Sequence, residues 1–201
     1  MFFLTTPSWF EKLKDFDQWL FLKINTGIGN PFFDAVLPFM RNSVNWAPLY
    51  IFLIVFALLN FRTKGAWWIL FFLVTVALTD MTGNFFKHFF ERPRPCLDPE
   101  LYGRMRLLVD NCSRGFSFTS NHAANHFGMG MFFYLTTRPL LKKWAVAGLI
   151  WAALISFAQV YVGVHYPFDI LGGTALGLIF GTLTGSLFNK RFGFAIFDNE
   201  Q

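Results

Sequence analysis

Charged side chains are scarce in this sequence: Asp, Glu, Lys and Arg make up 14% of its 201 residues, against roughly 25% in an ordinary globular protein. Hydrophobic residues make up 54% and aromatic residues 20%, including 29 Phe, and the mean hydropathy is +0.42. A soluble domain of this length would have to expose much of its Phe to water. The composition excludes the soluble, disordered and fibrous classes and leaves a polytopic helical membrane protein.

Long stretches with little or no charge predict the membrane spans, because a helix needs about 20 residues to cross a hydrocarbon core of about 30 Å. We expect five spans, centred on or covering residues 46–60, 65–90, 118–137, 144–164 and 170–189. The predicted fold is all-α, a bundle of five transmembrane helices, or six if the N-terminal segment also crosses. In the last span a glycine recurs every four residues, which predicts a packing ridge without chemistry: Gly173, Gly177, Gly181 and Gly185.

The first 40 residues have a different pattern. Apolar residues fall at helical spacing among charged ones, which is typical of an amphipathic helix lying in the membrane interface. A turn at 25–31 and a short helix at 32–40 are expected next. We predict one domain over residues 1–201, with 1–40 as an interfacial segment, 41–189 as the transmembrane core and 91–117 as an extracytoplasmic loop. The apolar positions of the first helix are Trp9, Phe10, Leu13, Phe16 and Leu20.

The sequence holds only two cysteines, Cys96 and Cys112, and both lie in the long loop. They could form a disulfide if the loop faces an oxidising compartment, or they could occur there by chance. The short connections on the opposite side carry Lys and Arg, which is typical of a cytoplasmic face. Because basic residues are also frequent from position 87 to 114, charge counting settles the orientation only if those residues serve a site.

Ionisable residues at membrane depth are costly and usually functional, and here they gather at the outer ends of three predicted spans. Lys87 and Arg94 supply a point charge and a planar fork, which suit a phosphate. Ser120 stands where the next helix would be capped, so first-turn N–H groups near Asn121 would point at the same anion. The sequence therefore predicts a phosphate site at one surface of the membrane.

Two histidines and one carboxylate complete this predicted site. His165 and Asp169 are four residues apart at the mouth of the last span, so they share a helix face. A carboxylate bonded to one imidazole nitrogen fixes the tautomer and raises the nucleophilicity of the other nitrogen. His122, from another helix, can act as general acid toward the leaving oxygen. These roles describe phosphoryl transfer, for which we expect neither a metal nor a cofactor.

The pattern resembles the type 2 phosphatidic acid phosphatase family over roughly residues 80–173. The family motif K-x6-R-P is matched by Lys87, Arg94 and Pro95, the motif P-S-G-H in part by residues 119–122, and S-R-x5-H-x3-D by His165 and Asp169. The resemblance implies a helical membrane core. It further implies that His165 forms a phosphohistidine, Asp169 orients it, His122 protonates the leaving group, and Lys87, Arg94 and Ser120 hold the phosphate.

The third motif departs from the family pattern, since Ala158 and Gln159 stand where Ser and Arg are expected. Gln159 can still donate a hydrogen bond to phosphate, but it brings no charge, and the lost charge-assisted bond costs about 1.5–3 kcal/mol. Four arginines are candidates to replace it: Arg92, Arg104, Arg106 and Arg114.

Other polar residues of this region have structural interpretations. We expect His88 to lie in the interface, and His126 and Asp80 to hydrogen-bond within the bundle. For Arg92, a role at the membrane surface and a phosphate contact are equally open. The acidic residues of the long loop are interpreted as solvated charges: Glu91, Asp98, Glu100 and Asp110.

The resemblance and the short chain suggest a phosphatase of a bacterial inner membrane with its site facing the periplasm. The expected partners are the lipid bilayer and a lipid phosphate, with no nucleic acid and no obligate protein. Undecaprenyl diphosphate is the first choice of substrate, and phosphatidylglycerol phosphate, phosphatidic acid and lipid A are the alternatives. A protein that binds lipid phosphates without turnover is a more distant alternative. A haem carrier is disfavoured, because both site histidines lie at helix mouths within phosphate-type motifs.

Overall fold

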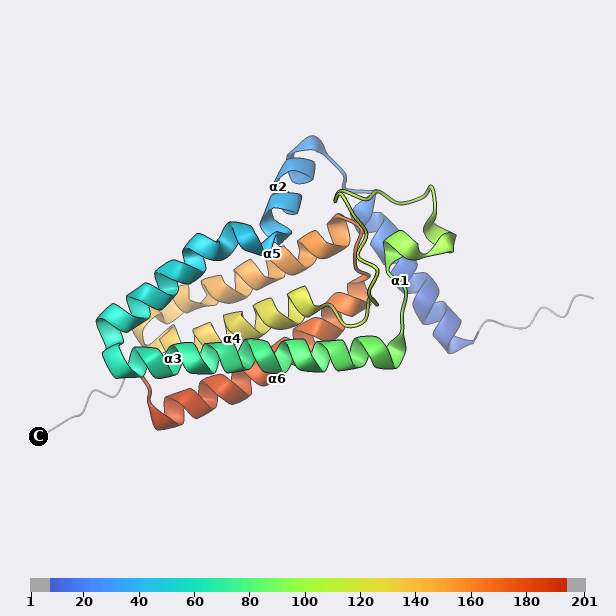
Figure 1. Cartoon of the computed structure of the whole chain (residues 1–201). Helices are drawn as coiled ribbons and strands as arrows, with labels where there is room; N and C mark the ends of the chain where they lie inside the picture. Colours follow the sequence, from blue (N-terminus) through green and yellow to red (C-terminus); the bar gives the residue numbers. More distant parts are fainter. Residues whose placement is uncertain (1–7, 195–201) are drawn as a thin grey trace, which may run out of the picture.

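The computed structural model describes residues 8–194, and every regular element in that range is a helix (Figure 1). The all-α prediction is confirmed, whereas the first seven residues of the predicted interfacial segment lie outside the described range. Short 3₁₀ turns occur at 43–46, 95–97, 99–101 and 142–146. The α-helices are α1 (Trp9–Asn25), α2 (Pro31–Arg41), α3 (Ala47–Phe90), α4 (Asn121–Leu141), α5 (Ala147–Tyr161) and α6 (Pro167–Arg191).

Helix α3 is two limbs joined at Arg62, whose φ of 49° breaks the helical path. The chain reverses there, so residues 47–61 and 63–90 run back along each other (Figure 1). The reversal is tight: a Cβ on Gly65 would lie 2.1 Å from the carbonyl oxygen of Ala57. The two limbs correspond to the first two predicted spans. By length and composition three stretches of the described chain are able to cross a membrane, Ser43–Leu101, Asn121–Tyr161 and Pro167–Arg191, and the count of five stays a prediction.

The glycine ridge of α6 packs against α4. A Cβ on Gly173 would lie 2.4 Å from the carbonyl oxygen of Ser120, and one on Gly177 would lie 2.5 Å from that of Ala124. Only glycine allows backbones to approach this closely, and dispersion over such contacts is a main source of helix association in lipid. The predicted packing role is confirmed, and the ridge fixes the N-terminus of α4 beside that of α6.

Helices α1 and α2 lie at the end of the bundle that also carries the loop between α3 and α4 (Figure 1). A capping box of Ser8 and Glu11 begins α1. Trp9 and Phe10 of this helix are 66% and 68% exposed, whereas Asp17 and Asn25 are fully buried. Exposed aromatic side chains on a helix that buries Asp and Asn toward the bundle suit a helix that lies in a membrane interface, and that placement remains a prediction.

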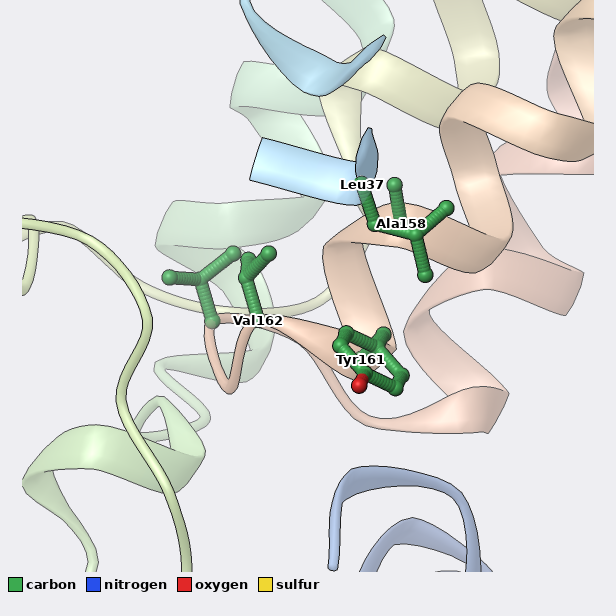
Figure 2. Packing of buried hydrophobic residues seen from close by; sticks show 5 residues of the cluster. Leu37, Ala158, Tyr161 and Val162 are labelled. Atoms are coloured by element: carbon green, nitrogen blue, oxygen red, sulfur yellow. The ribbon is translucent and has the colours of Figure 1, made fainter. Parts of the chain in front are cut away.

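The end of α2 is anchored on the end of α5. Leu37 packs with Ala158, Tyr161 and Val162 in one buried cluster (Figure 2). The Tyr161 hydroxyl also donates to Asp34 of α2 at 2.6 Å. The anchor matters for the site because it brings the last residue of α2 against α5.

The loop between α3 and α4 covers the same end of the bundle. The structure joins Cys96 and Cys112 by a disulfide, with Cα atoms 6.0 Å apart. The Leu108 N–H donates to the carbonyl oxygen of Val162 at 3.1 Å, and the buried amide of Asn25 donates to the carbonyl oxygen of Arg106 at 2.8 Å. The loop is thus tied to both α1 and the end of α5.

Candidate active site

His165 and Asp169 come together where α5 passes into α6. His165 Nδ1 lies 3.4 Å from Asp169 Oδ2, and both side chains are buried. The same oxygen accepts the Tyr166 N–H at 2.8 Å and the hydroxyl of Ser117, which lies 3.5 Å from His165 Nδ1. A carboxylate held by several donors keeps its charge and its direction. The predicted pairing of these two residues is therefore present in the structure.

Arg94 determines which imidazole nitrogen carries the lone pair. Its Nη1 lies 3.2 Å from His165 Nε2 and donates to the carbonyl oxygen of Val164 at 3.2 Å. Because a guanidinium has no acceptor, Nε2 must be the acceptor, so the proton of the neutral ring sits on Nδ1, facing Asp169. The nucleophilic lone pair of His165 consequently points to the arginine that is predicted to hold phosphate.

The site is buried and positively charged, and both properties keep His165 neutral. Burial is the main cause that lowers the pKa of His165 to about 4; the hydrogen bond and charge of Asp169 oppose it, and the charges of Arg94 and Lys87 act with it. Lys87 is half-buried near the end of α3, and its ammonium group makes no hydrogen bond or salt bridge to residues 8–194. A neutral imidazole beside unpaired cations is suited to attack on an anion.

Arg92 is bound to carboxylates. Its Nη1 donates to Asp169 Oδ1 at 2.9 Å, and its Nη2 donates to Asp17 Oδ2 at 2.6 Å. The guanidinium carbon lies 4.0 Å from the ring centre of Tyr166. Neither role that the sequence left open describes it: Arg92 is a partner of the site carboxylate, with its charge already compensated.

The beginning of α4 brings Ser120 and His122 to the site. Ser120 is fully buried and caps α4, its hydroxyl oxygen accepting the Ala123 N–H at 3.4 Å and its own N–H donating to the carbonyl oxygen of Asp169 at 3.1 Å. His122 lines a polar cavity of about 500 Å³. Other polar residues of this cavity are Arg41, Asn42, Ser43, Asp110 and Asn111.

The side chain of Asn121 is turned to α3. Its Nδ2 donates to Asp80 Oδ1 and to Asn84 Oδ1, both at 2.8 Å. A contact of the Asn121 amide group with phosphate would have to break these bonds, and the predicted contact through first-turn N–H groups stays a prediction. Asp80 has the structural role that its position predicts, since it joins α3 to α4.

Comparison with known proteins identifies the family of this chain. A family model described as the PAP2 superfamily matches residues 67–192. The chain belongs to this superfamily. A lipid A 4′-phosphatase of Bacteroides thetaiotaomicron is 34% identical over 83% of this chain and 74% of that protein. A second lipid A 4′-phosphatase, from Porphyromonas gingivalis, is 28% identical over 85% and 72%.

The fold is shared with a solved PAP2 structure. A transmembrane PAP2-type phosphatidylglycerolphosphate phosphatase from Bacillus subtilis superposes with a TM-score of 0.72 at 23% identity, covering 90% of this chain and 88% of that one. The family model and the 34% identical relative confirm the predicted family and show that the chain is one of the membrane phosphatases.

This chain lacks the arginine that the PAP2 pattern has at position 159, and Arg41 contacts the glutamine that stands there. Arg41 Nε donates to Gln159 Oε1 at 3.2 Å across 118 residues of sequence. Among the arginines that the sequence offered as substitutes, Arg92 pairs with Asp17 and Asp169, and Arg106 pairs with Asp34. Arg104 and Arg114 are exposed in the loop. The guanidinium that contacts Gln159 in residues 8–194 is therefore none of these four, because α2 reaches the site, and no local pattern predicts that.

One loop carboxylate is also buried, contrary to the prediction of a solvated charge. Asp98 is 6% exposed and accepts hydrogen bonds from the Tyr166 hydroxyl at 2.6 Å and from Gln18 at 3.1 Å. It ties α1 and the residue after His165 to the loop. Burial raises the pKa of Tyr166, and its bond to Asp98 raises it further.

Asp17, Ser117 and Arg41 are site residues that the sequence did not indicate. A signal existed for Asp17, which shares one buried stripe of α1 with Phe21 and Asn25. Ser117 and Arg41 carry no motif, and only their contacts in the folded chain identify them.

Proposed function

We propose that this PAP2 protein hydrolyses a phosphate ester of a membrane lipid by transferring the phosphoryl group to His165, and that lipid A is its substrate. One observation carries the mechanism: the lone pair of His165 Nε2 faces Arg94 while Nδ1 faces Asp169. The role of each residue is the one that the family resemblance implies.

In the first step, Nε2 of His165 attacks phosphorus as the bond to the lipid oxygen breaks. The new bond leaves the imidazole cationic, and Asp169 stabilises it through Nδ1–H. Arg94, Lys87 and Ser120 hold the phosphoryl oxygens, and His122 gives a proton to the departing oxygen of the lipid. Atoms and charge balance, since the lipid leaves as an alcohol and the phosphoryl group remains on His165.

In the second step, water attacks the phosphohistidine. His122, which lost its proton in the first step, takes one from the water, and the N–P bond breaks with its electrons returning to Nε2. Inorganic phosphate leaves, and both histidines recover their starting states. No step requires a metal ligand or a cofactor.

A lipid substrate fits the surroundings of the site. Ser43 lines both the polar cavity with His122 and a largely apolar hollow of about 350 Å³ beside α3 and α4. The polar cavity thus offers room for a phosphate head group, and the adjoining apolar hollow offers room for an acyl chain. Lipid A is preferred because the two relatives described above bear that substrate in their names and align with most of this chain. Undecaprenyl diphosphate, the preference from sequence, remains the main competing substrate.

The test is phosphate release by purified protein from four lipids in one detergent: lipid A, undecaprenyl diphosphate, phosphatidylglycerol phosphate and phosphatidic acid. We expect the highest kcat/KM for lipid A, and loss of release in His165→Ala but not in His88→Ala, a matched change at an exposed histidine. A higher kcat/KM for undecaprenyl diphosphate would reject the substrate assignment alone. Release no greater than that of His165→Ala from every lipid would reject the enzyme and favour a binding protein.

A further inference from the structure

Arg41 is the last residue of α2, and its guanidinium enters the site from outside the PAP2 motifs. Its Nε donates to Gln159 Oε1 at 3.2 Å, and the two residues are 118 positions apart. The packing of Leu37 on Ala158 holds this helix end in place (Figure 2). Arg41 therefore stands against the residue that replaces the family arginine.

The bond to Arg41 also fixes how the Gln159 amide points. An arginine only donates, so Oε1 must face Arg41 and the NH₂ group must face away. Gln159 is fully buried, and its Nε2 has no hydrogen-bond partner within residues 8–194. A buried donor without an acceptor costs about 1–3 kcal/mol. An unsatisfied donor of this kind indicates that a ligand with a hydrogen-bond acceptor binds beside Gln159.

Arg41 has no anion of its own in the described chain. Its side chain makes one hydrogen bond, to Gln159, and no salt bridge. Arg92 and Arg106, by contrast, are each paired with carboxylates. Burial lowers the pKa of Arg41, so the charge is partly withdrawn from water without a compensating partner. That condition is costly unless an anion binds.

Arg41 is also close to the catalytic groups. It lines the polar cavity together with His122. Burial lowers the pKa of Arg94, Asp169 raises it, and the charge of Arg41 lowers it further. The Val164 N–H donates to the carbonyl oxygen of Gln159 at 3.2 Å, and the Val164 carbonyl oxygen accepts from Arg94. Arg41 and Arg94, neither of which forms a salt bridge within residues 8–194, thus contact Gln159 and Val164, which lie six residues and one residue before His165.

We propose that Arg41 supplies the phosphate-binding guanidinium that position 159 lacks, and that Gln159 positions it and donates its own Nε2–H to the same phosphate. The charge comes from the end of α2 instead of from α5, so α2 completes the site. This inference rests on the proposed function for the identity of the anion, a phosphoryl group.

The test moves the guanidinium charge from position 41 to position 159. Vanadate binding by the full-length protein is measured for Arg41→Gln, Gln159→Arg and the double variant Arg41→Gln with Gln159→Arg, with Arg104→Gln as a matched change at an exposed arginine. We expect Arg41→Gln to weaken vanadate binding about tenfold. Gln159→Arg should also weaken it, because a second guanidinium meets the first at short range. The double variant should recover most of the affinity.

Unchanged vanadate affinity in Arg41→Gln would overturn the proposal. Tighter binding by Gln159→Arg alone would also overturn it, because it would mean that no guanidinium occupies the phosphate-binding position next to residue 159. If Arg41→Gln loses thermal stability, Arg41→Lys and the double variant decide: both keep one charge and must bind more tightly than Arg41→Gln. The two proposals fail separately. Vanadate binding that depends on Arg41 without lipid turnover rejects the enzyme, whereas turnover that needs His165 but not Arg41 rejects this inference.

Discussion

Asp17 of α1 accepts a hydrogen bond of 2.6 Å from the guanidinium of Arg92, which at its other end donates to Asp169. The second oxygen of Asp17 accepts the Phe168 N–H at 3.0 Å, in the first turn of α6. Helix α1, which lies outside the bundle core, therefore contacts both Arg92, the partner of Asp169, and the backbone of Phe168 next to Asp169. The interfacial segment takes part in building the site.

Asp17→Ala should lower kcat about tenfold, equivalent to ~1.4 kcal/mol, with little change in KM. Without Asp17, the whole charge of Arg92 falls on Asp169, which then stabilises the His165 imidazolium less well. Asp15→Ala, an exposed change in the same helix, is the control for kinetics on a lipid substrate. Equal losses in both variants, or a rise in KM alone, would contradict a positioning role for Asp17.

His122 should matter most for substrates whose leaving group needs a proton. Removing His122 by His122→Ala is expected to slow release from a lipid phosphate by at least about 100-fold, and to slow much less the phosphoenzyme formation from an aryl phosphate with an acidic leaving group. His165→Ala should abolish both reactions. Rapid-quench kinetics on the two substrates measures the difference. A His122→Ala defect of equal size on both would reject the division of roles.

Turnover should persist in excess EDTA, because Lys87, Arg94 and Arg41 supply the positive charge that a metal would otherwise provide. Within residues 8–194, no three His, Cys, Asp or Glu side chains are grouped as ligands for a metal ion. Vanadate should inhibit by resembling the transition state at His165. Activity that disappears in EDTA and returns with Mg²⁺ would refute this mechanism.

The disulfide tests the orientation. Cys96 and Cys112 are joined in the structure, and such bonds persist in oxidising compartments. Cells lysed in an alkylating agent should yield the two cysteines as one linked peptide pair by mass spectrometry, with neither thiol alkylated. Full alkylation of both thiols in the unreduced sample would place the loop on a reducing side and reverse the predicted topology.

Much of the fold follows from short-range patterns in the sequence. The apolar stretches, the amphipathic first helix and the four-residue glycine spacing all have counterparts in the described helices. Six of the predicted site residues lie at or near a helix end: Lys87, Arg94, Ser120, His122, His165 and Asp169. Among them, Arg94 and Asp169 contact His165, and Ser120 contacts Asp169. These features depend on periodicity and local spacing, which a sequence displays directly.

Contacts between residues far apart in the sequence could not be predicted from such patterns. Arg41 reaches Gln159 because Leu37 packs on α5, and Asp98 is buried because Tyr166 and Gln18 donate to it. Asn121 faces Asp80 because α3 passes beside the start of α4. Each depends on how one helix end lies against another, which neither hydropathy nor a motif encodes.

The most direct test of the account is to trap the phosphoenzyme. Protein mixed with lipid A or an aryl phosphate is quenched at alkaline pH and digested, and the phosphorylated peptide is mapped by mass spectrometry. The account predicts one phosphoryl group on the peptide containing His165, absent from His165→Ala and accumulating in His122→Ala with the aryl phosphate, since the water step also needs His122. Turnover with no phosphoryl group on His165, or a phosphoryl group on another residue, would contradict it.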